Sequence, residues 1–210
     1  MGVVLIKNEN EEKLINVLTP NIIQERLINI SMFITVYEWV TDYLITTVKD
    51  FYLSGCKNGK NIYDGYEENV INKASGKGGR QWRGTLLWLL GNGAILQTDI
   101  AALREITDVR NDIVHKMLSY LYSGPIERLD EHQITLINLA QKVSKWLFKE
   151  VEMPTSGQYT PEDYDKINFE DIENMGIEWL RMIRGAAINS DSKYMQELIK
   201  IIKQQRAEKL

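Results

Sequence analysis

Hydrophobic residues recur at helical spacing over most of the chain. The clearest run covers residues 21 to 53, where steps of three and four residues place the apolar side chains on one stripe: Ile23, Leu27, Ile30, Ile34, Tyr37, Leu44 and Val48. This pattern predicts a long helix that packs against the core or a partner. The same spacing predicts helices over residues 82 to 90, 99 to 122, with Asp99 as N-cap, and 130 to about 153.

The segment from residue 54 to residue 80 interrupts the helical pattern, because glycines and polar residues predominate in it. We expect a long irregular connection with a short helix around residues 65 to 73. No strand-like alternation of useful length is found in the chain. A connection of this length inside a compact domain usually has a function or is mobile.

A turn-rich stretch over residues 155 to 160 separates the C-terminal part of the chain from the rest. Thr160, Pro161 and Asp163 then combine an N-cap, a proline at the first helical position and an acid in the first turn, which is typical of a helix start. Short helices are predicted over residues 161 to 167 and 169 to 184, and a last one from about residue 192 to the C-terminus. The fold class is therefore all-α, with about four core helices in a bundle (residues 1–154) and a C-terminal helical extension (residues 155–210).

The composition excludes several classes of protein. With 25 Lys plus Arg against 29 Asp plus Glu, the net charge is −4, which argues against a protein that coats nucleic acid through bulk charge. A single cysteine, Cys56, rules out an internal disulfide framework, and two histidines leave little room for a metal site, so no metal or cofactor is expected. No apolar run reaches the length of a membrane helix, and the first residues lack the basic region of a signal peptide, so we expect a cytoplasmic protein without a membrane span.

One segment carries candidate chemistry: Arg110-Asn111-Asp112-Ile113-Val114-His115, inside a predicted helix. Asn111 and His115 share a face, and Arg110 lies about 140° around the helix and about 7.5 Å along it from His115, a gap that a long side chain can cross. The arginine fork matches two phosphate oxygens, and a histidine can take a proton from a ribose 2′-hydroxyl or give one to a leaving 5′-oxygen. One histidine does not easily do both, but a two-fold dimer would supply a second copy.

In these residues the chain resembles the HEPN superfamily, α-helical domains marked by an arginine, a short spacer and a histidine, commonly with a polar residue directly after the arginine. The resemblance implies a metal-independent endoribonuclease that acts as a homodimer, of the kind found in toxin–antitoxin and antiviral defence systems. Arg110 would then hold the scissile phosphate, Asn111 would orient the site and His115 would transfer protons, leaving a 2′,3′-cyclic phosphate and a 5′-hydroxyl. An antitoxin or another defence-system protein is the implied protein partner.

Other interpretations of these residues stay open at this point. Arg110 and His115 can be an ordinary ion-paired or hydrogen-bonded pair on a helix surface, since Asp108 and Asp112 are near in sequence. The chain can also be a non-catalytic HEPN-like module that binds RNA or nucleotide, or a subunit scaffold whose C-terminal helices contact a partner. Glu38 either orients Arg110 or His115 from the first helix or faces solvent, and His132 is expected to be a solvated first-turn residue.

A second feature is a basic, glycine-rich run after residue 72. It does not have the spacing of a phosphate-binding P-loop. Its cations and its tryptophan favour an RNA clamp, in which the cations contact phosphates and the ring stacks on a base: Lys73, Lys77, Arg80, Arg83 and Trp82. Equally, the run can be a solvated loop in which Trp82 begins a buried helix.

Overall fold

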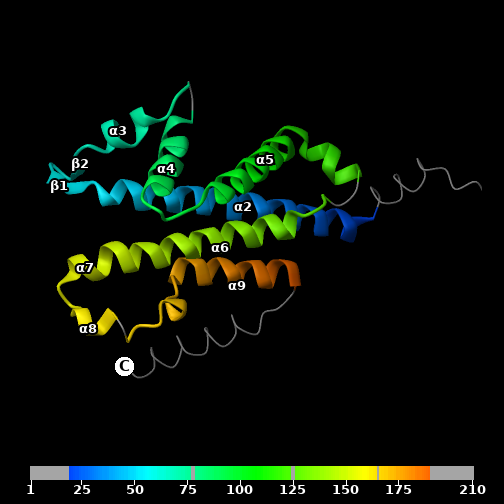
Figure 1. The fold of residues 1–210 in the computed structure, drawn as a ribbon. Helices are drawn as coiled ribbons and strands as arrows, with labels where there is room; N and C mark the ends of the chain where they lie inside the picture. The colour runs from blue at the N-terminus through cyan, green and yellow to red at the C-terminus, as the bar shows by residue number, and fades with distance from the viewer. Residues whose placement is uncertain (1–18, 77–78, 124–125, 165, 190–210) are drawn as a thin grey trace, which may run out of the picture.

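A computed structural model describes residues 19–76, 79–123, 126–164 and 166–189 (Figure 1). The predicted all-α fold class is confirmed, because helices account for most of this structure. The larger helices are α2 (Pro20–Phe51), α4 (Arg80–Gly91), α5 (Gln97–Ser123), α6 (Leu129–Leu147) and α9 (Met175–Asn189). The shorter elements are the strands β1 (Leu53–Lys57) and β2 (Lys60–Tyr63), α3 (Tyr66–Asn69), the 3-10 helices η1 (Ile71–Lys73) and η3 (Phe169–Asp171), the π-helix η2 (Phe148–Glu152), α7 (Met153–Ser156) and α8 (Pro161–Tyr164).

Helix α2 is the central element and contacts α4, α5, α6 and α9. In Figure 1 it runs between α4 and α5 on one side and α6 and α9 on the other. Most of the predicted stripe faces the core: Ile30, Tyr37, Leu44 and Val48 are buried, whereas Leu27 is 39% exposed. Burial of each such side chain contributes about 1.5–3 kcal/mol, which offsets the low helix propensity of the β-branched residues in this helix. The prediction of one long helix over residues 21 to 53 is therefore confirmed.

The predicted irregular connection of residues 54 to 80 contains a hairpin that the sequence pattern did not indicate, because β1 and β2 pair as antiparallel strands. Asn58 and Gly59 at its tip both have positive φ, which is the geometry of the two-residue turn that Asn-Gly sequences favour. The strands escaped detection because they are short and almost wholly exposed, so no apolar alternation marks them. The predicted short helix of residues 65 to 73 exists only as α3 and η1.

The helix that carries the Arg110–His115 segment starts earlier than predicted. It begins at Gln97, and Asp99 is not its N-cap but lies in its first turn. The Asp99 carboxylate accepts the backbone N–H of Leu96 at 2.7 Å and pairs with Lys142 of α6 at 2.6 Å. One residue after His115 the helix is kinked, since Lys116 has the non-helical angles φ −124° and ψ 24°.

The C-terminal elements differ in part from the prediction. The helix start at Thr160 is confirmed, and the Asp163 carboxylate accepts both the backbone N–H and the hydroxyl of Thr160 at 2.8 Å. The predicted helix of residues 169 to 184 is wrong over its first turns, where η3 and an extended stretch precede α9. Ile177 and Leu180 of α9 are buried in the same hydrophobic cluster as the α2 stripe. The helix predicted from residue 192 lies outside the described residues, and the two-part division of the chain stays a prediction.

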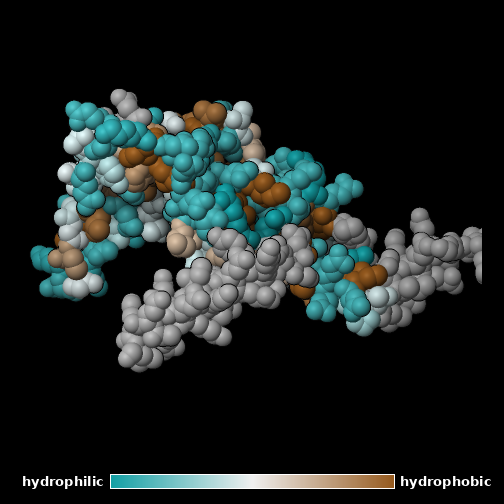
Figure 2. Space-filling view, turned by 90° about the horizontal axis from the view of Figure 1, so that it is seen from below, coloured by the Kyte–Doolittle hydropathy of each residue, from teal (hydrophilic) through white to brown (hydrophobic). Residues whose placement is uncertain are grey.

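On the face seen from below, hydrophobic residues form separate patches among hydrophilic ones (Figure 2). Within the ranges given above, no helix has both the length and the apolar character that a membrane crossing requires.

A close backbone approach fixes α4 against the preceding segment, and it gives the first testable prediction. A Cβ atom on Gly84 would lie 2.2 Å from the carbonyl oxygen of Val70, a backbone atom that cannot turn aside. We expect Gly84→Ala to lower the free energy of unfolding by about 1–3 kcal/mol, measured by urea denaturation. Gly185→Ala is the matched control, because its Cβ meets nothing within 4 Å and should instead stabilise α9 by about 0.5–1 kcal/mol. Equal effects of the two substitutions would contradict this account.

His132 is buried, so the prediction of a solvated first-turn residue is wrong. Only 5% of the residue is exposed, and its ring lies 6.4 Å from that of Phe33. Burial, with the Arg128 charge as a smaller cause, lowers the pKa of His132 below its usual value, while Glu105 and Glu131 act in the opposite direction. The signal was present in the sequence, because His132 lies three residues from Leu129 and four from Leu136, both of which are buried.

This lowered pKa predicts a pH dependence of stability. The unfolded chain binds the His132 proton more readily than the folded chain, so stability is fully present above about pH 6.5 and is lost as the pH falls through the folded-state pKa. Thermal unfolding midpoints measured between about pH 5 and pH 7.5 should fall toward acid in the wild-type protein and fall less steeply in His132→Gln. An identical slope in the two proteins would show that other groups cause the dependence.

Candidate functional site

Arg110 is held in place by the neighbouring helix. Its Nε donates to Oε1 of Glu38 at 3.0 Å and its Nη2 donates to the same oxygen, so that α2 fixes the guanidinium from the side. Its Cζ atom lies 5.5 Å from the centroid of the Tyr37 ring, and the Tyr37 hydroxyl lies 3.1 Å from that of Thr107 on α5. Both interpretations of Glu38 therefore apply: its side chain is 51% exposed to solvent, and its carboxylate binds the Arg110 guanidinium.

The ion pair of Arg110 is formed with Glu38, which is not one of the two carboxylates near it in sequence. Neither Asp108 nor Asp112 pairs with Arg110 in the described structure. The carboxylate of Asp112 is bound by Lys116 at 2.6 Å and by the Tyr120 hydroxyl, and these contacts hold the pKa of Asp112 below its usual value. The Asp112 carboxylate is thus committed to its own helix.

Asn111 and His115 are exposed on α5, one helical turn apart. Nη1 of Arg110 donates to Oδ1 of Asn111 at 3.2 Å, which joins the first two residues of the motif. No hydrogen bond or ion pair of His115 is found among the residues that the structure describes. The structure therefore brings Arg110 and Asn111 together and leaves the imidazole open to solvent, without a contact between Arg110 and His115.

Helices α4 and α5 diverge from their short connection (Figure 1). Residues of both helices, Asn111 among them, line a groove. Its volume is about 780 Å³. Asn111, Trp82 and Arg83 all line it, so residues from the motif and from the basic run meet at one surface. This is the arrangement that the sequence alone did not establish.

The described residues of the basic run lie at the end of η1 and in the first turn of α4. Arg83 folds back and donates to the backbone carbonyl of Ser75 at 2.8 Å, while Lys73 and Arg80 are exposed. Trp82 is half-buried in the first turn of α4, where it packs against the core and also lines the groove. Its interpretation as the start of a helix on the core is confirmed, whereas its stacking on an RNA base stays a prediction. Lys77 lies outside the described residues.

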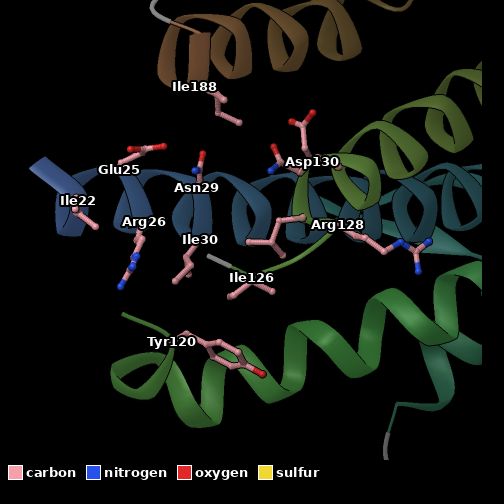
Figure 3. Close-up of a pocket in the computed structure, with 12 residues that line it drawn as sticks. Ile22, Glu25, Arg26, Asn29, Ile30, Tyr120, Ile126, Arg128, Asp130 and Ile188 are labelled. Carbon is pink, nitrogen blue, oxygen red and sulfur yellow. The ribbon is translucent and has the colours of Figure 1, made fainter. Parts of the chain in front are cut away.

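A second hollow, of about 390 Å³, lies near the N-terminal end of α2 (Figure 3). In the close-up, Glu25 and Asn29 point toward α9, whereas Arg26 points toward the end of α5, where it donates to the carbonyl of Leu121 at 2.5 Å. Arg128 and Asp130 at its edge already have partners, Arg128 in Glu105 and Glu131, and Asp130 in Arg184. Because these charges are satisfied internally, this hollow offers less to a ligand than the groove beside Asn111.

No cluster of three or more histidine, cysteine, aspartate or glutamate side chains within the described ranges has a geometry that could hold a metal ion. Sequence reasoning identified the motif and weighed Glu38, but it did not find Arg104 and Asp108 as groove residues. Their spacing of four on the same helix as Asn111 was the available signal.

No protein-family model, no curated protein and no solved structure matches this chain. The functional conclusion therefore depends on the geometry and on the motif.

Proposed function

We propose that this protein is a metal-independent endoribonuclease of the HEPN type, a toxin or antiviral defence effector that cuts RNA at a site shared between two subunits. The observation that carries the proposal is the combination on α5 of a guanidinium anchored by Glu38 and an exposed, unpaired imidazole, as far as the described residues show. The proposal rests on these groups and on the resemblance to HEPN domains.

The anchored arginine keeps donors for a phosphate. A guanidinium has five N–H groups, of which Glu38 accepts two and Asn111 accepts one. Two N–H groups remain on the terminal nitrogens and can contact phosphate oxygens. Glu38 therefore orients Arg110 without using all of its donors.

The reaction is a transesterification within RNA. The 2′-oxygen attacks the adjacent phosphorus and loses its proton to a histidine, the bond to the 5′-oxygen breaks, and a second histidine donates a proton to that oxygen. Arg110 would stabilise the negative charge that develops on the phosphate oxygens. The products are a 2′,3′-cyclic phosphate and a 5′-hydroxyl.

The second histidine would be His115 of another copy of the chain. Val114 and Leu118 flank His115 and are exposed to 44% and 68%, which is an apolar surface suited to contact between subunits. A two-fold axis near these residues would bring the two His115 side chains together. This supports the expected homodimer, which stays a prediction.

The test is incubation of the full chain with mixed RNA in excess EDTA over a series of pH values. Cleavage that leaves 2′,3′-cyclic phosphate ends supports the proposal. The absence of cleavage at every pH would overturn it, and retained RNA affinity in that case would favour the non-catalytic HEPN-like module.

Glu38 gives a prediction that separates orientation from charge. Glu38→Ala should lower the single-turnover cleavage rate about tenfold, because Arg110 loses the carboxylate that orients it. Affinity for RNA should not weaken, since a negative charge next to the phosphate site is removed. Asp42→Ala on the same helix is the control and should change neither quantity. A faster rate in Glu38→Ala would mean that Glu38 blocks Arg110 instead of positioning it.

A further inference from the structure

The groove between α4 and α5 has the form of a site for a small planar group. Part of its lining is apolar, with Leu86 and Leu90 from α4 and Leu103 from α5, and the Trp82 side chain also lines it. Its volume of about 780 Å³ lies in the range of about 300–1,000 Å³ that is usual for ligand pockets. An aromatic ring system can bury its faces against these side chains.

Two exposed residues of the groove lining carry charges of opposite sign. Arg104 and Asp108 lie one helical turn apart on α5, and both are exposed. Neither has a hydrogen bond or an ion pair within the described part of the chain. Asn111 follows on the same side, and its Nδ2 is not used by Arg110.

These groups form one stripe that leads to the proposed catalytic histidine. Arg104, Asp108, Asn111 and His115 are separated by four, three and four residues, which keeps them within about 60° of one another around the helix. Asn111 and His115 are about 6 Å apart along the axis, before the kink at Lys116. A group held in the groove is therefore next to the place where His115 would act.

The donor and acceptor set favours one nucleobase. Arginine is only a donor and matches the O6 and N7 acceptors of guanine, whereas an ionised aspartate is only an acceptor and matches the N1–H and N2–H₂ donors on another edge of the same base. Adenine and cytosine also have an exocyclic amine, but it has no ring N–H beside it, and uracil has no exocyclic amine. Only guanine therefore offers two adjacent acceptors to the arginine and two adjacent donors to the carboxylate. Trp82 adds a face on which a base can stack.

We infer that the α4–α5 groove binds a guanine base of single-stranded RNA, in the nucleotide next to the phosphate that is cleaved. The position relative to the cleaved phosphate rests on the proposed function, whereas base binding does not require catalysis. The groove would then give the enzyme its sequence preference.

Binding is measured with short 2′-O-methyl oligoribonucleotides, which lack the attacking hydroxyl and cannot be cleaved. Fluorescence anisotropy should show that an oligouridine with one central guanosine binds the wild-type protein about tenfold more tightly than oligouridine alone, since a good bidentate contact to a base discriminates by about 1–3 kcal/mol, or about 5- to 150-fold. Equal affinities would overturn the inference. Displacement by free GMP at the concentration that suffices for the oligomer would replace RNA by a free nucleotide as the occupant, and would also overturn it.

Asp108→Asn is the decisive variant because the two possible roles of Asp108 predict different changes in RNA binding. If Asp108 is only a surface charge, its loss should tighten the binding of every RNA by reducing repulsion. If it reads guanine, the variant should lose the tenfold preference for the guanosine oligomer. Asp42→Asn, at an exposed carboxylate in a different hollow, is the matched control and should keep the preference.

The two proposals fail in different ways. An inactive protein that still prefers guanosine would overturn the nuclease and keep the groove. A protein that cleaves RNA without a preference at guanosine, and whose Asp108→Asn variant binds all oligomers more tightly, would keep the nuclease and overturn the groove.

Discussion

Replacing His115 by alanine should lower the rate of RNA cleavage by about 10²- to 10⁴-fold, the usual effect of removing a general acid or base. The expected loss is large because each subunit contributes only this exposed imidazole, so that a dimer loses both proton-transfer groups at once. The fold should not suffer, since His115 makes no hydrogen bond or ion pair within the described residues. Single-turnover kinetics in EDTA measure the rate, and the thermal unfolding midpoint measures the fold.

His132 provides the control within the same chain. It is the second of two histidines and is buried against Phe33, away from the surface that Asn111 and His115 share. His132→Gln, assayed at a temperature where it is folded, should retain the wild-type cleavage rate. Cleavage that persists in His115→Ala would remove His115 from the mechanism, whatever the result for His132.

The sequence predicts the helices that bury a continuous apolar stripe. It does not predict the elements whose residues stay exposed, because no apolar pattern distinguishes them from a loop. Helix α2 was found because steps of three and four residues persist along its core-facing side. The β1–β2 hairpin is not predicted because its residues are nearly all exposed, and the Asn58-Gly59 pair at its turn is the sequence signal that marks it. Local turn chemistry was the better signal in this part of the chain.

His132 shows a different cause of error. The acids Asp130 and Glu131 before it suggest a solvated first turn, but they indicate only that their own side of α6 faces solvent, whereas His132 lies on the buried side. The chain enters α6 through Arg128 in a left-handed conformation with φ +63°, and Leu129 then begins the buried side. Periodicity measured from Leu129 would have placed His132 in the core.

The candidate site was predictable as a set of residue types and not as an arrangement. The spacing of Arg110, Asn111 and His115 could be read from one helix, whereas the contact between Arg110 and Glu38 joins residues 72 positions apart. That contact depends on how α2 packs against α5. The groove depends in addition on the divergence of α4 from α5, which no local pattern in the sequence specifies.

Arg110→Lys should lower the cleavage rate by about 10²- to 10³-fold although the positive charge is kept, which is the range seen when one donor to a developing negative charge is removed. A guanidinium can contact Glu38 with one edge and phosphate with the other, because its donors point outward from one rigid plane. An ammonium has three donors on a single nitrogen and cannot hold both partners in that geometry. Affinity for a non-cleavable RNA should change little, so the loss should appear in the single-turnover rate.

Arg181→Lys on α9 is the control for this substitution, because Arg181 is also an exposed arginine paired with a glutamate, Glu178. It should leave the cleavage rate unchanged. If Arg110 and Glu38 act as one unit, Glu38→Ala should cost less in an Arg110→Lys background than its tenfold effect in the wild-type protein, because lysine has already lost the oriented geometry. Full activity of Arg110→Lys would instead show that Arg110 has no role in cleavage and only forms an ion pair with Glu38 on the protein surface.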